Sequence, residues 1–345
     1  MKTKTKPTLG DVARAAGVSQ TTASYILNDR AEQMRIAADT EERVRRAAAE
    51  LRYRPNPSAR SLRLASTRTI GLVSDLVAGG QFASQMLVGA TTAARELDHI
   101  VVIGESQGDP KLERLLIEEL LDRHVDGIVW ATVVTSYVTL PKALRGQRVV
   151  LLNCLDRNQQ LPTVVPDEYE GGRTAARLVL AGEGRGRVHV VGERPTGGAF
   201  GAWLRRDGIR DELRSAGVRP GTPIPCAWAV QPAFEAVDAF LRGGARPATL
   251  ICLNDRIAMG TYQALAEHGL TVPDDVSVVS FDGSELATWL RPEATSVALP
   301  YAQLGARAVE LLLNPEPGGP DVTRLPMPVS TGASLWGATR GGAGV

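Results

Sequence analysis

Near the start of the chain, apolar positions recur with the period of an α-helix. The stretch TLGDVARAAG places them at i, i+3, i+4 and i+7, which predicts a helix whose inner face is formed by Leu9, Val12, Ala13 and Ala16. Thr8 followed by Asp11 predicts a capping box at the start of this helix. Gly17 is suited to a sharp turn at its end, because glycine adopts positive φ at little cost.

Two further helices are expected after this turn. Ser19 is expected to cap a helix that runs to about Leu27, and Thr40 to cap a third within TEERVRRAAAELRY. The inward positions of the third helix are Val44, Ala47, Ala48 and Leu51. Three short helices, with a tight glycine turn between the first two, are typical of a helix-turn-helix domain.

From residue 69 onward, short apolar runs alternate with stretches of helical period. The runs expected to form strands are TIGLVSDL, HIVVIGES, DGIVWATV, RVVLLNCL, RVHVVG, IPCAWAV, ATLICLN and VSVVSFD. Helical stretches such as PKLERLLIEELLDR lie between them, here with Asp109 as the cap and Pro110 as the first residue. Continuous apolar strands that alternate with helices predict parallel sheets covered on both faces, and this many strands predicts two lobes.

The second predicted helix has an outer face without charge. One arc holds hydrogen-bonding side chains and an aromatic ring: Gln20, Thr21, Ser24 and Tyr25. The opposite arc is small and mostly apolar: Thr22, Ala23, Ile26 and Leu27. An ordinary exposed helix face carries Glu, Lys and Arg. Short neutral donors and acceptors suit base edges in the DNA major groove, so we interpret this helix as a DNA-reading element.

The distribution of charge agrees with this interpretation. Residues 1–69 carry 14 Lys and Arg against 7 Asp and Glu, whereas residues 70–345 carry 25 against 31. A basic head on an acidic body indicates a head that meets a polyanion, although a solvated basic tail has the same charge. The three cysteines lie far apart, and neither an apolar stretch of about 18 residues nor a signal peptide is visible. We therefore expect a cytoplasmic protein without a disulfide framework, metal cluster or membrane span.

An arginine-rich segment follows the predicted third helix. RYRPNPSARSLRLASTRTIG has no acidic residue and contains Arg52, Arg54, Arg60, Arg63 and Arg68. Pro57 after Asn56 predicts the start of a helix that is too short to be stable alone in water. On DNA, Ala59 and Leu62 would form an apolar wedge flanked by arginines, as in proteins that open base steps from the minor groove. A flexible basic linker is the alternative interpretation.

Together these motifs resemble the head, hinge and start of the core in the lac repressor family, the LacI/GalR regulators. The matching stretches are TLGDVARAAGVSQTTASYILN, RYRPNPSARSLR and TRTIGLV, with a longer loop, DRAEQMRIAAD, between the second and third helices. The resemblance implies that bases are read by Gln20, Thr21 and Tyr25. It also implies phosphate contacts from Ser19 and Thr22, and Leu62 as the minor-groove lever. Many members read TVSRVLN where this chain reads TASYILN, so Tyr25 replaces a common arginine and the bases that it meets stay open.

The resemblance extends to the body, where it implies the fold of periplasmic sugar-binding proteins. The expected fold class is a small all-α helix-turn-helix head plus an α/β two-lobed periplasmic-binding-protein-like core with parallel sheets. The expected segments are a head at 1–56, a hinge helix and linker at 57–69, and a core at 70–340. The first lobe would comprise about 70–166 and 296–322, and the second about 167–295 and 323–340, with three crossings between them.

Polar and aromatic residues follow several predicted strands, at the edge where open parallel sheets bind ligands. Four of them match positions that line the effector cleft of the family: Arg205, Trp228, Asn254 and Asp282. The first-lobe candidates match the family less uniformly: Asp75, Phe82 and Asp156. Carboxylates, an amide, a guanidinium and aromatic faces suit a saccharide. For each residue alone, a helix cap or core packing is the competing interpretation, and Asp255 is expected to cap its helix.

Motifs typical of enzymes are missing from the sequence. It has no GxxxxGK[ST], GxSxG or HExxH and no GxGxxG after a strand, and its four histidines are scattered. We therefore expect a homodimeric regulator that represses genes for carbohydrate uptake or catabolism, binds a near-palindromic operator, and is released by a small sugar-like effector. The DNA-binding candidates include Asn56, Ala59 and Arg60, and neither a cofactor nor a metal nor a membrane partner is expected. LWGATRGGAGV has no heptad pattern for a tetramerisation coiled coil. The alternatives are a sugar-binding receptor and a purine-responsive, corepressor-dependent regulator.

Overall fold

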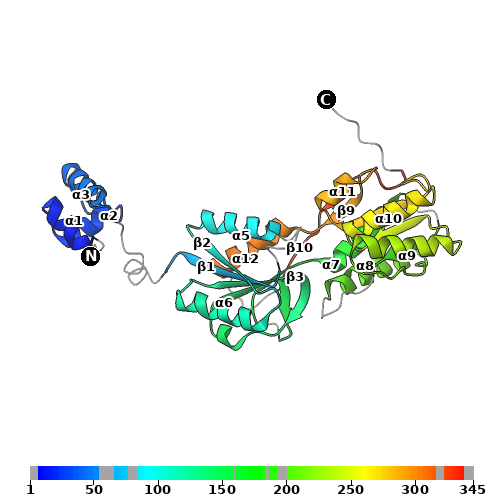
Figure 1. Ribbon diagram of the computed structural model, residues 1–345, viewed down its shortest axis with the longest axis horizontal. Coiled ribbons are helices and arrows are strands. Elements are labelled where there is room, and N and C mark those ends of the chain that lie inside the picture. Colours follow the sequence, from blue (N-terminus) through cyan, green and yellow to red (C-terminus); the bar gives the residue numbers. More distant parts are fainter. Residues whose placement is uncertain are drawn as a thin grey trace, which may run out of the picture. The chain divides into compact units, whose positions relative to one another are not determined.

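The computed structural model describes residues 7–53, 66–76, 84–158, 160–182, 186–192, 200–315 and 322–337. The chain divides into two compact units, Met1–Thr67 and Arg68–Val345, which are described separately (Figure 1). Within the described stretches, no helix combines the length and the apolar character that crossing a bilayer requires.

The described part of the first unit consists of α1 (Leu9–Ala16), α2 (Gln20–Leu27) and α3 (Ala38–Glu50). The Asp11 amide donates a hydrogen bond to the Thr8 hydroxyl, and the Thr8 amide donates one to the Asp11 carboxylate. Gly17 has a φ of +66°, the left-handed conformation that turns the chain from α1 into α2. The predicted capping box and glycine turn are thus confirmed.

Small and β-branched side chains form the core of this unit. Val12, Ile26 and Val44 are completely buried, one from each helix. Ala23 of α2 is also completely buried, and its small side chain lets α2 approach its neighbours closely. The predicted inner positions Val12, Ala13, Ala16, Ala23, Ile26, Val44, Ala47 and Ala48 are therefore buried. The inward assignment of Leu51 is wrong, because α3 ends at Glu50 and Leu51, in the cap position after it, is 37% exposed.

The start of α3 differs from the prediction. The helix begins at Ala38 with Ala37 in the cap position, so Thr40 lies inside the first turn and does not cap it. Asp39 and Glu41 also lie in this first turn. Negative charge there interacts favourably with the positive end of the helix dipole, which explains why the helix extends to the N-terminal side of Thr40.

The second unit contains a six-stranded parallel sheet in the order β10-β5-β4-β3-β1-β2, which defines the first lobe. Its strands are β1 (Thr69–Ser74), β2 (Ile100–Glu105), β3 (Ile128–Val138), β4 (Val149–Asp156), β5 (Thr163–Pro166) and β10 (Val322–Leu325). One face is covered by α5 (Ser84–Glu96) and α12 (Tyr301–Leu313), and the other by α6 (Pro110–Asp122) and the short helix η1 (Lys142–Leu144) (Figure 1). Because both faces are covered, β4 is buried along its whole length.

A second sheet, in the order β11-β9-β8-β7-β6, defines the second lobe. Its strands are β6 (Val188–Val191), β7 (Thr249–Cys252), β8 (Ser277–Asp282), β9 (Thr295–Ala298) and β11 (Val329–Ser330). All neighbours are parallel except β11, which runs antiparallel to β9. The helices of this lobe are α7 (Glu168–Ala181), α8 (Gly201–Ser215), α9 (Val230–Arg242), α10 (Asp255–Glu267) and α11 (Glu285–Trp289).

One predicted strand is wrong. The run IPCAWAV, residues 224–230, forms a single bridge between Ile224 and Val191 and then leads into α9. Pro225 has no amide hydrogen to donate to a ladder, which explains why the pairing stops there. The sequence analysis also missed four short strands: β5, β9, β10 and β11.

The positions at which the chain passes between the lobes follow from the sheets. It leaves the first sheet after β5, returns after β9 and leaves again after β10. Thr295–Ala298 belongs to the second lobe and Val322–Leu325 to the first, so the last two passages lie a few residues later than expected.

Candidate functional site

The candidate DNA-reading surface is the exposed side of α2. Ser19, Gln20 and Thr21 are exposed, whereas Thr22 and Tyr25 are half-buried. The Ser19 hydroxyl caps the helix by accepting a hydrogen bond from the Thr22 amide at 3.0 Å, and the two hydroxyl oxygens lie 2.9 Å apart. The first turn of α2 therefore presents two hydroxyls, with free backbone amides of the helix start beside them, and such a helix start attracts phosphate.

The two longest polar side chains of α2 have neighbours that limit their range. A Cβ atom added at Gly10 would lie 2.8 Å from Nε2 of Gln20, so the Gln20 side chain lies against the start of α1. The Arg30 guanidinium lies over the Tyr25 ring, 5.8 Å from its centroid. A cation at this position is attracted to the face of the Tyr25 ring and places positive charge beside it.

The hinge candidates are not part of this surface as described. Asn56, Ala59, Arg60 and Leu62 lie outside the described residues, which end at Tyr53 and resume at Ser66. Their assignment rests on the sequence motif and stays a prediction.

In the second lobe, Arg205 of α8 lies in the middle of the predicted effector residues. Its guanidinium forms a two-bond ion pair with Glu168, the first residue of α7, and both side chains are 3% exposed. Its Nη1 atom also donates to the Leu253 carbonyl at 2.8 Å and lies 3.6 Å from Oδ1 of Asp282. Burial alone would lower the pKa of Arg205, but the Glu168 and Asp282 carboxylates raise it above its usual value.

The close packing of α7 against α8 explains why Glu168 meets Arg205. A Cβ atom added at Gly172 would lie 2.1 Å from the Arg205 carbonyl oxygen, and one at Gly208 would lie 2.1 Å from the Tyr169 carbonyl oxygen. Only glycine permits helices to approach to such distances. The sequence analysis missed Glu168, although the pair of glycines in YEGGR and the glycine in RRDG indicate this contact.

Two carboxylates sit beside this ion pair. Asp282 ends β8 with a φ of +99°, a conformation that few residues other than glycine adopt. Burial, with the Arg205 charge opposing it and the Asp255 and Glu168 charges adding to it, raises the pKa of Asp282 to about 7. The group therefore changes protonation near neutral pH, in a site where carboxylates outnumber the guanidinium.

The expected cap role of Asp255 is wrong. Asn254 caps α10 through the Ile257 amide at 2.8 Å, and Asp255 is the first helical residue, with no exposed surface. The Asp255 carboxylate instead accepts hydrogen bonds from hydroxyls or amides on three neighbouring elements: Ser280, Ser284 and Ser296. Burial raises the pKa of Asp255, and these hydrogen bonds oppose the shift. Asp255 thus ties α10, β8 and β9 together directly behind Asp282.

Aromatic rings complete the second-lobe group. The Arg205 guanidinium lies 4.8 Å from the centroid of the Phe281 ring and 5.7 Å from that of the Trp228 ring. Trp228 is half-buried and packs against the core, so it combines the two interpretations given to it from the sequence. The structure therefore brings together three of the predicted residues of this lobe: Arg205, Trp228 and Asp282. Asn254 follows Leu253, whose carbonyl binds Arg205, but its own side chain caps α10.

The first lobe contributes fewer groups. Oδ1 of Asp75, at the end of β1, accepts hydrogen bonds from the Val133 amide at 2.9 Å and the Leu76 amide at 2.7 Å, so it braces the sheet edge. Asp156 ends β4 and is 8% exposed, and Phe82 lies outside the described residues. No short contact joins Asp75 or Asp156 to the Arg205 group among the described residues.

Two first-lobe residues that the sequence analysis did not select do reach this group. The Thr135 hydroxyl of β3 lies 2.7 Å from Oδ1 of Asn153 and 3.4 Å from Oε1 of Glu168. Tyr301 opens α12, and burial, together with the charge of Asp282, raises its pKa well above the usual value. A cavity of about 560 Å³ lies between Asp282 and Tyr301, lined by both lobes. Its lining includes Gln85 of α5 and Gln303 of α12, whose amide groups both donate and accept hydrogen bonds.

The chemistry of this group is that of a binding site for hydroxyls. Carboxylate and carbonyl oxygens accept hydrogen bonds, and the aromatic rings offer apolar faces. Among the described residues, no group of three metal-ligating side chains lies together.

Each of the two units is similar to a known protein family. Residues 8–56 match the family model of bacterial regulatory proteins, lacI family, and residues 178–335 match a periplasmic binding protein-like domain. The lac repressor dimer bound to operator and the anti-inducer ONPF has a similar fold, with a TM-score of 0.79 at 24% identity over 96% of this chain and 99% of that chain.

Relatives with known roles are also similar over nearly the whole chain. The transcriptional repressor PurR of Vibrio parahaemolyticus is 31% identical over 320 residues, 89% of this chain and 91% of that protein. The ribose operon repressor of Escherichia coli is 29% identical over 314 residues, 89% of this chain and 92% of that protein. These relatives are DNA-binding repressors and not enzymes, in agreement with the missing catalytic motifs. The chain belongs to the lacI family of bacterial regulatory proteins.

Proposed function

We propose that this regulator represses genes for carbohydrate uptake or breakdown and is released from its operator by a sugar bound between the lobes. It acts in the cytoplasm, as a homodimer whose two heads read a near-palindromic operator. The observation that carries the choice of ligand is the charge around Arg205. Glu168 neutralises the guanidinium, and Asp282 and Asp255 add negative charge beside it.

This environment favours a neutral ligand rich in hydroxyl groups over an anionic one. A sugar hydroxyl donates to the carboxylate oxygens of Asp282, and its C–H face packs on the Trp228 ring. An anion would have to approach excess carboxylates at a site with little water, which is unfavourable. The relatives leave both ligand classes open, since PurR and the ribose operon repressor carry purine-type and sugar-type names.

A purine is the second candidate, and one observation favours it. Trp228 is half-buried beside Arg205, whereas Phe281 is completely buried, and a planar base stacks on an accessible aromatic ring. In that case the ligand would act as a corepressor and strengthen operator binding instead of weakening it.

Release by the effector would follow from contacts that span the lobes. Thr135 and Tyr301 from the first lobe meet the Glu168 and Asp282 group of the second. A ligand that binds one arrangement of these lobes more tightly shifts the population toward it. Operator affinity falls if that arrangement is incompatible with DNA-bound heads.

The test is a gel shift with the full-length protein and a DNA fragment from upstream of its own gene. A panel of sugars and a panel of purines are added separately. We expect a retarded band that one or more sugars dissociate. A band that forms only with a purine would replace the sugar proposal by the corepressor alternative, and no band under any condition would favour the receptor alternative.

Two variants locate the ligand. Asp282→Asn should keep the retarded band and lose its response to the active sugar by at least about tenfold in effective concentration, because a carboxylate acceptor is lost. Asp274→Asn makes the same chemical change at an exposed site of the second lobe and should respond like the unsubstituted protein. An unchanged response in Asp282→Asn would contradict this placement of the effector.

A further inference from the structure

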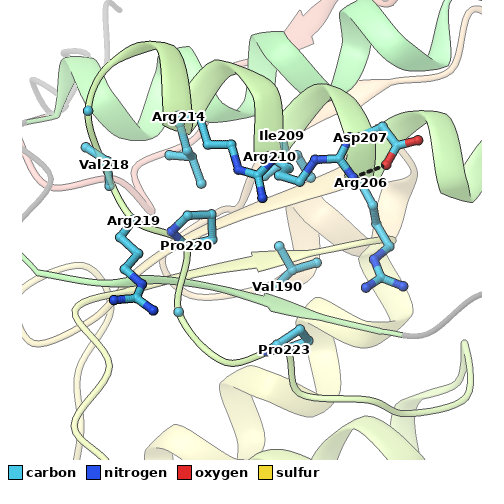
Figure 2. Close-up of a pocket in the computed structure, with 13 residues that line it drawn as sticks. Val190, Arg206, Asp207, Ile209, Arg210, Arg214, Val218, Arg219, Pro220 and Pro223 are labelled. Atoms are coloured by element: carbon cyan, nitrogen blue, oxygen red, sulfur yellow. Dashed lines mark ion pairs between the residues drawn. The ribbon is translucent and has the colours of Figure 1, made fainter.

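A separate cavity of about 570 Å³ lies in the second lobe between α8, the turn that follows it, and β6 (Figure 2). We call it the α8 cavity. It has no lining residue in common with the candidate effector residues. Its volume lies within the range of about 300–1,000 Å³ that small-molecule sites occupy.

Arginines dominate the lining of the α8 cavity. Arg206, Arg210 and Arg214 are spaced by four residues and therefore lie along one face of α8. Arg219 comes from the turn after the helix, which begins at Gly217 with a φ of +74°. Figure 2 shows the three helical arginines above the cavity and Arg219 at one end of it.

The lining of the α8 cavity contains more basic than acidic residues. Four arginines and one aspartate, Asp207, make a formal charge of +3. Asp207 pairs with Arg210 at 2.7 Å, and Arg210 also binds Asp211 at 3.0 Å. Arg214 and Arg219 are exposed, and neither forms an ion pair with a described residue. Both guanidinium groups thus lack a carboxylate at ion-pair distance among the described residues. The hydrogen bond from Arg210, together with the charge of Arg214, lowers the pKa of the nearby Asp211.

The rest of the lining is apolar. Ile209 and Leu213 of α8 are 1% and 0% exposed and line the cavity. Val190 of β6 lies between Ile209 and Pro223 in the lining (Figure 2). An apolar wall lowers the local dielectric constant, which strengthens the attraction between a guanidinium and an anion. The cavity therefore combines a surface for packing with charged groups that fix orientation.

We propose that the α8 cavity binds a small molecule that carries a phosphate group. A guanidinium group donates two parallel hydrogen bonds to two oxygens of a phosphate. A phosphate ester carries close to two negative charges near neutral pH. The surrounding body carries 25 Lys and Arg against 31 Asp and Glu, so this cluster stands out from an acidic background. The proposal is independent of the sugar effector, because it concerns a different cavity.

Isothermal titration calorimetry with inorganic pyrophosphate and the full-length protein, at constant ionic strength, tests the proposal. We expect saturable binding that the double variant Arg214→Ala/Arg219→Ala weakens by about tenfold or more, because it removes two charge-assisted contacts. Both side chains are exposed, so the fold should persist, and the melting temperature of the variant checks this.

A charge-matched control is needed because the basic head also attracts polyanions. Arg145→Ala/Arg246→Ala removes two exposed arginines of the second unit that do not line the cavity, and it should change the affinity less than about twofold. Equal weakening in both double variants, or no saturable binding, would overturn the proposal. Citrate that bound as tightly as pyrophosphate would also overturn it, since charge alone would then explain binding.

Discussion

The buried pair between Arg205 and Glu168 allows a quantitative prediction. Arg205→Met removes the cation and leaves Glu168, which is 3% exposed, close to Asp282 without compensation. Breaking a buried ion pair in this way costs about 3–5 kcal/mol of unfolding free energy. For a unit of this size, about 2 °C of melting temperature corresponds to each kcal/mol, so we expect a fall of about 6–10 °C.

Substitution of the other member of the pair, Glu168, should lower the unfolding free energy less. Glu168→Gln leaves the guanidinium with the Leu253 carbonyl at 2.8 Å and Asp282 at 3.6 Å, and the amide still accepts a hydrogen bond. We expect a loss of about 1–3 kcal/mol. The double variant Glu168→Gln/Arg205→Met should lose about 2 kcal/mol less unfolding free energy than the two single variants together. Both charges are removed in it, so neither is left buried without its partner.

Urea unfolding followed by circular dichroism measures all four members of this cycle. The control is the ion pair between Arg173 of α7 and Glu212 of α8, which joins the same two helices at 2.7 Å but has an arginine that is 38% exposed. Arg173→Met/Glu212→Gln should show a coupling below about 1 kcal/mol. A coupling at Arg205 and Glu168 no larger than the error of about 0.5 kcal/mol would refute the reasoning.

Three other substitutions test different parts of the molecule. Gly172→Ala should destabilise the second unit strongly in thermal unfolding, since its Cβ would lie 2.1 Å from a backbone oxygen of Arg205, whereas Gly243→Ala, with its nearest contact at 3.3 Å and no positive φ, should not. Asp282→Asn should gain stability relative to the unsubstituted protein as pH rises from about 4 toward 7. The folded pKa of Asp282, about 7, lies above the unfolded value of about 3.9. The unsubstituted protein therefore loses stability as pH rises across this window, whereas the Asn variant does not. A melting difference that is independent of pH would contradict the raised pKa of Asp282. Tyr25→Arg should change the preferred operator bases in a selection from random DNA, and an unchanged preference would remove Tyr25 from the reading surface.

The parts of the fold that could be predicted from sequence are those that depend on near neighbours. The capping box of Thr8 and Asp11 and the turn at Gly17 involve residues within one helical turn of each other. The alternation of strands and helices in the body is likewise visible, because most strands form apolar runs and most helices show a helical period. The first residue of α3 could not be predicted in this way. Asp39 and Glu41 in the first turn favour a start at Ala38, before the expected cap Thr40.

The site was only partly predictable, because its main contact joins distant positions. Glu168 and Arg205 lie 37 residues apart, and they meet because Gly172 lets α7 approach α8. Tyr301 lies in a different lobe from Asp282, so no local pattern connects them. The second-lobe residues that follow strands could be selected, since the carboxyl ends of parallel strands share one edge of the sheet. What each does there depends on partners that only the folded chain brings close. Asn254 caps α10 in place of Asp255, and the Asp255 carboxylate binds serines of neighbouring elements.

Helix α8 connects two sites of opposite charge. Arg205 lies in a group where two carboxyl groups, those of Glu168 and Asp282, face a single guanidinium. Arg206, the next residue, lines a cavity whose lining has a formal charge of +3. Successive residues of a helix are rotated by about 100°, so one helix can serve both environments. A neutral polyol is favoured at the first site and a phosphate-bearing molecule at the second, so the same small molecule should not compete for both. If both proposals hold, the two ligands act on one rigid element, and each should alter the affinity of the other by the same factor.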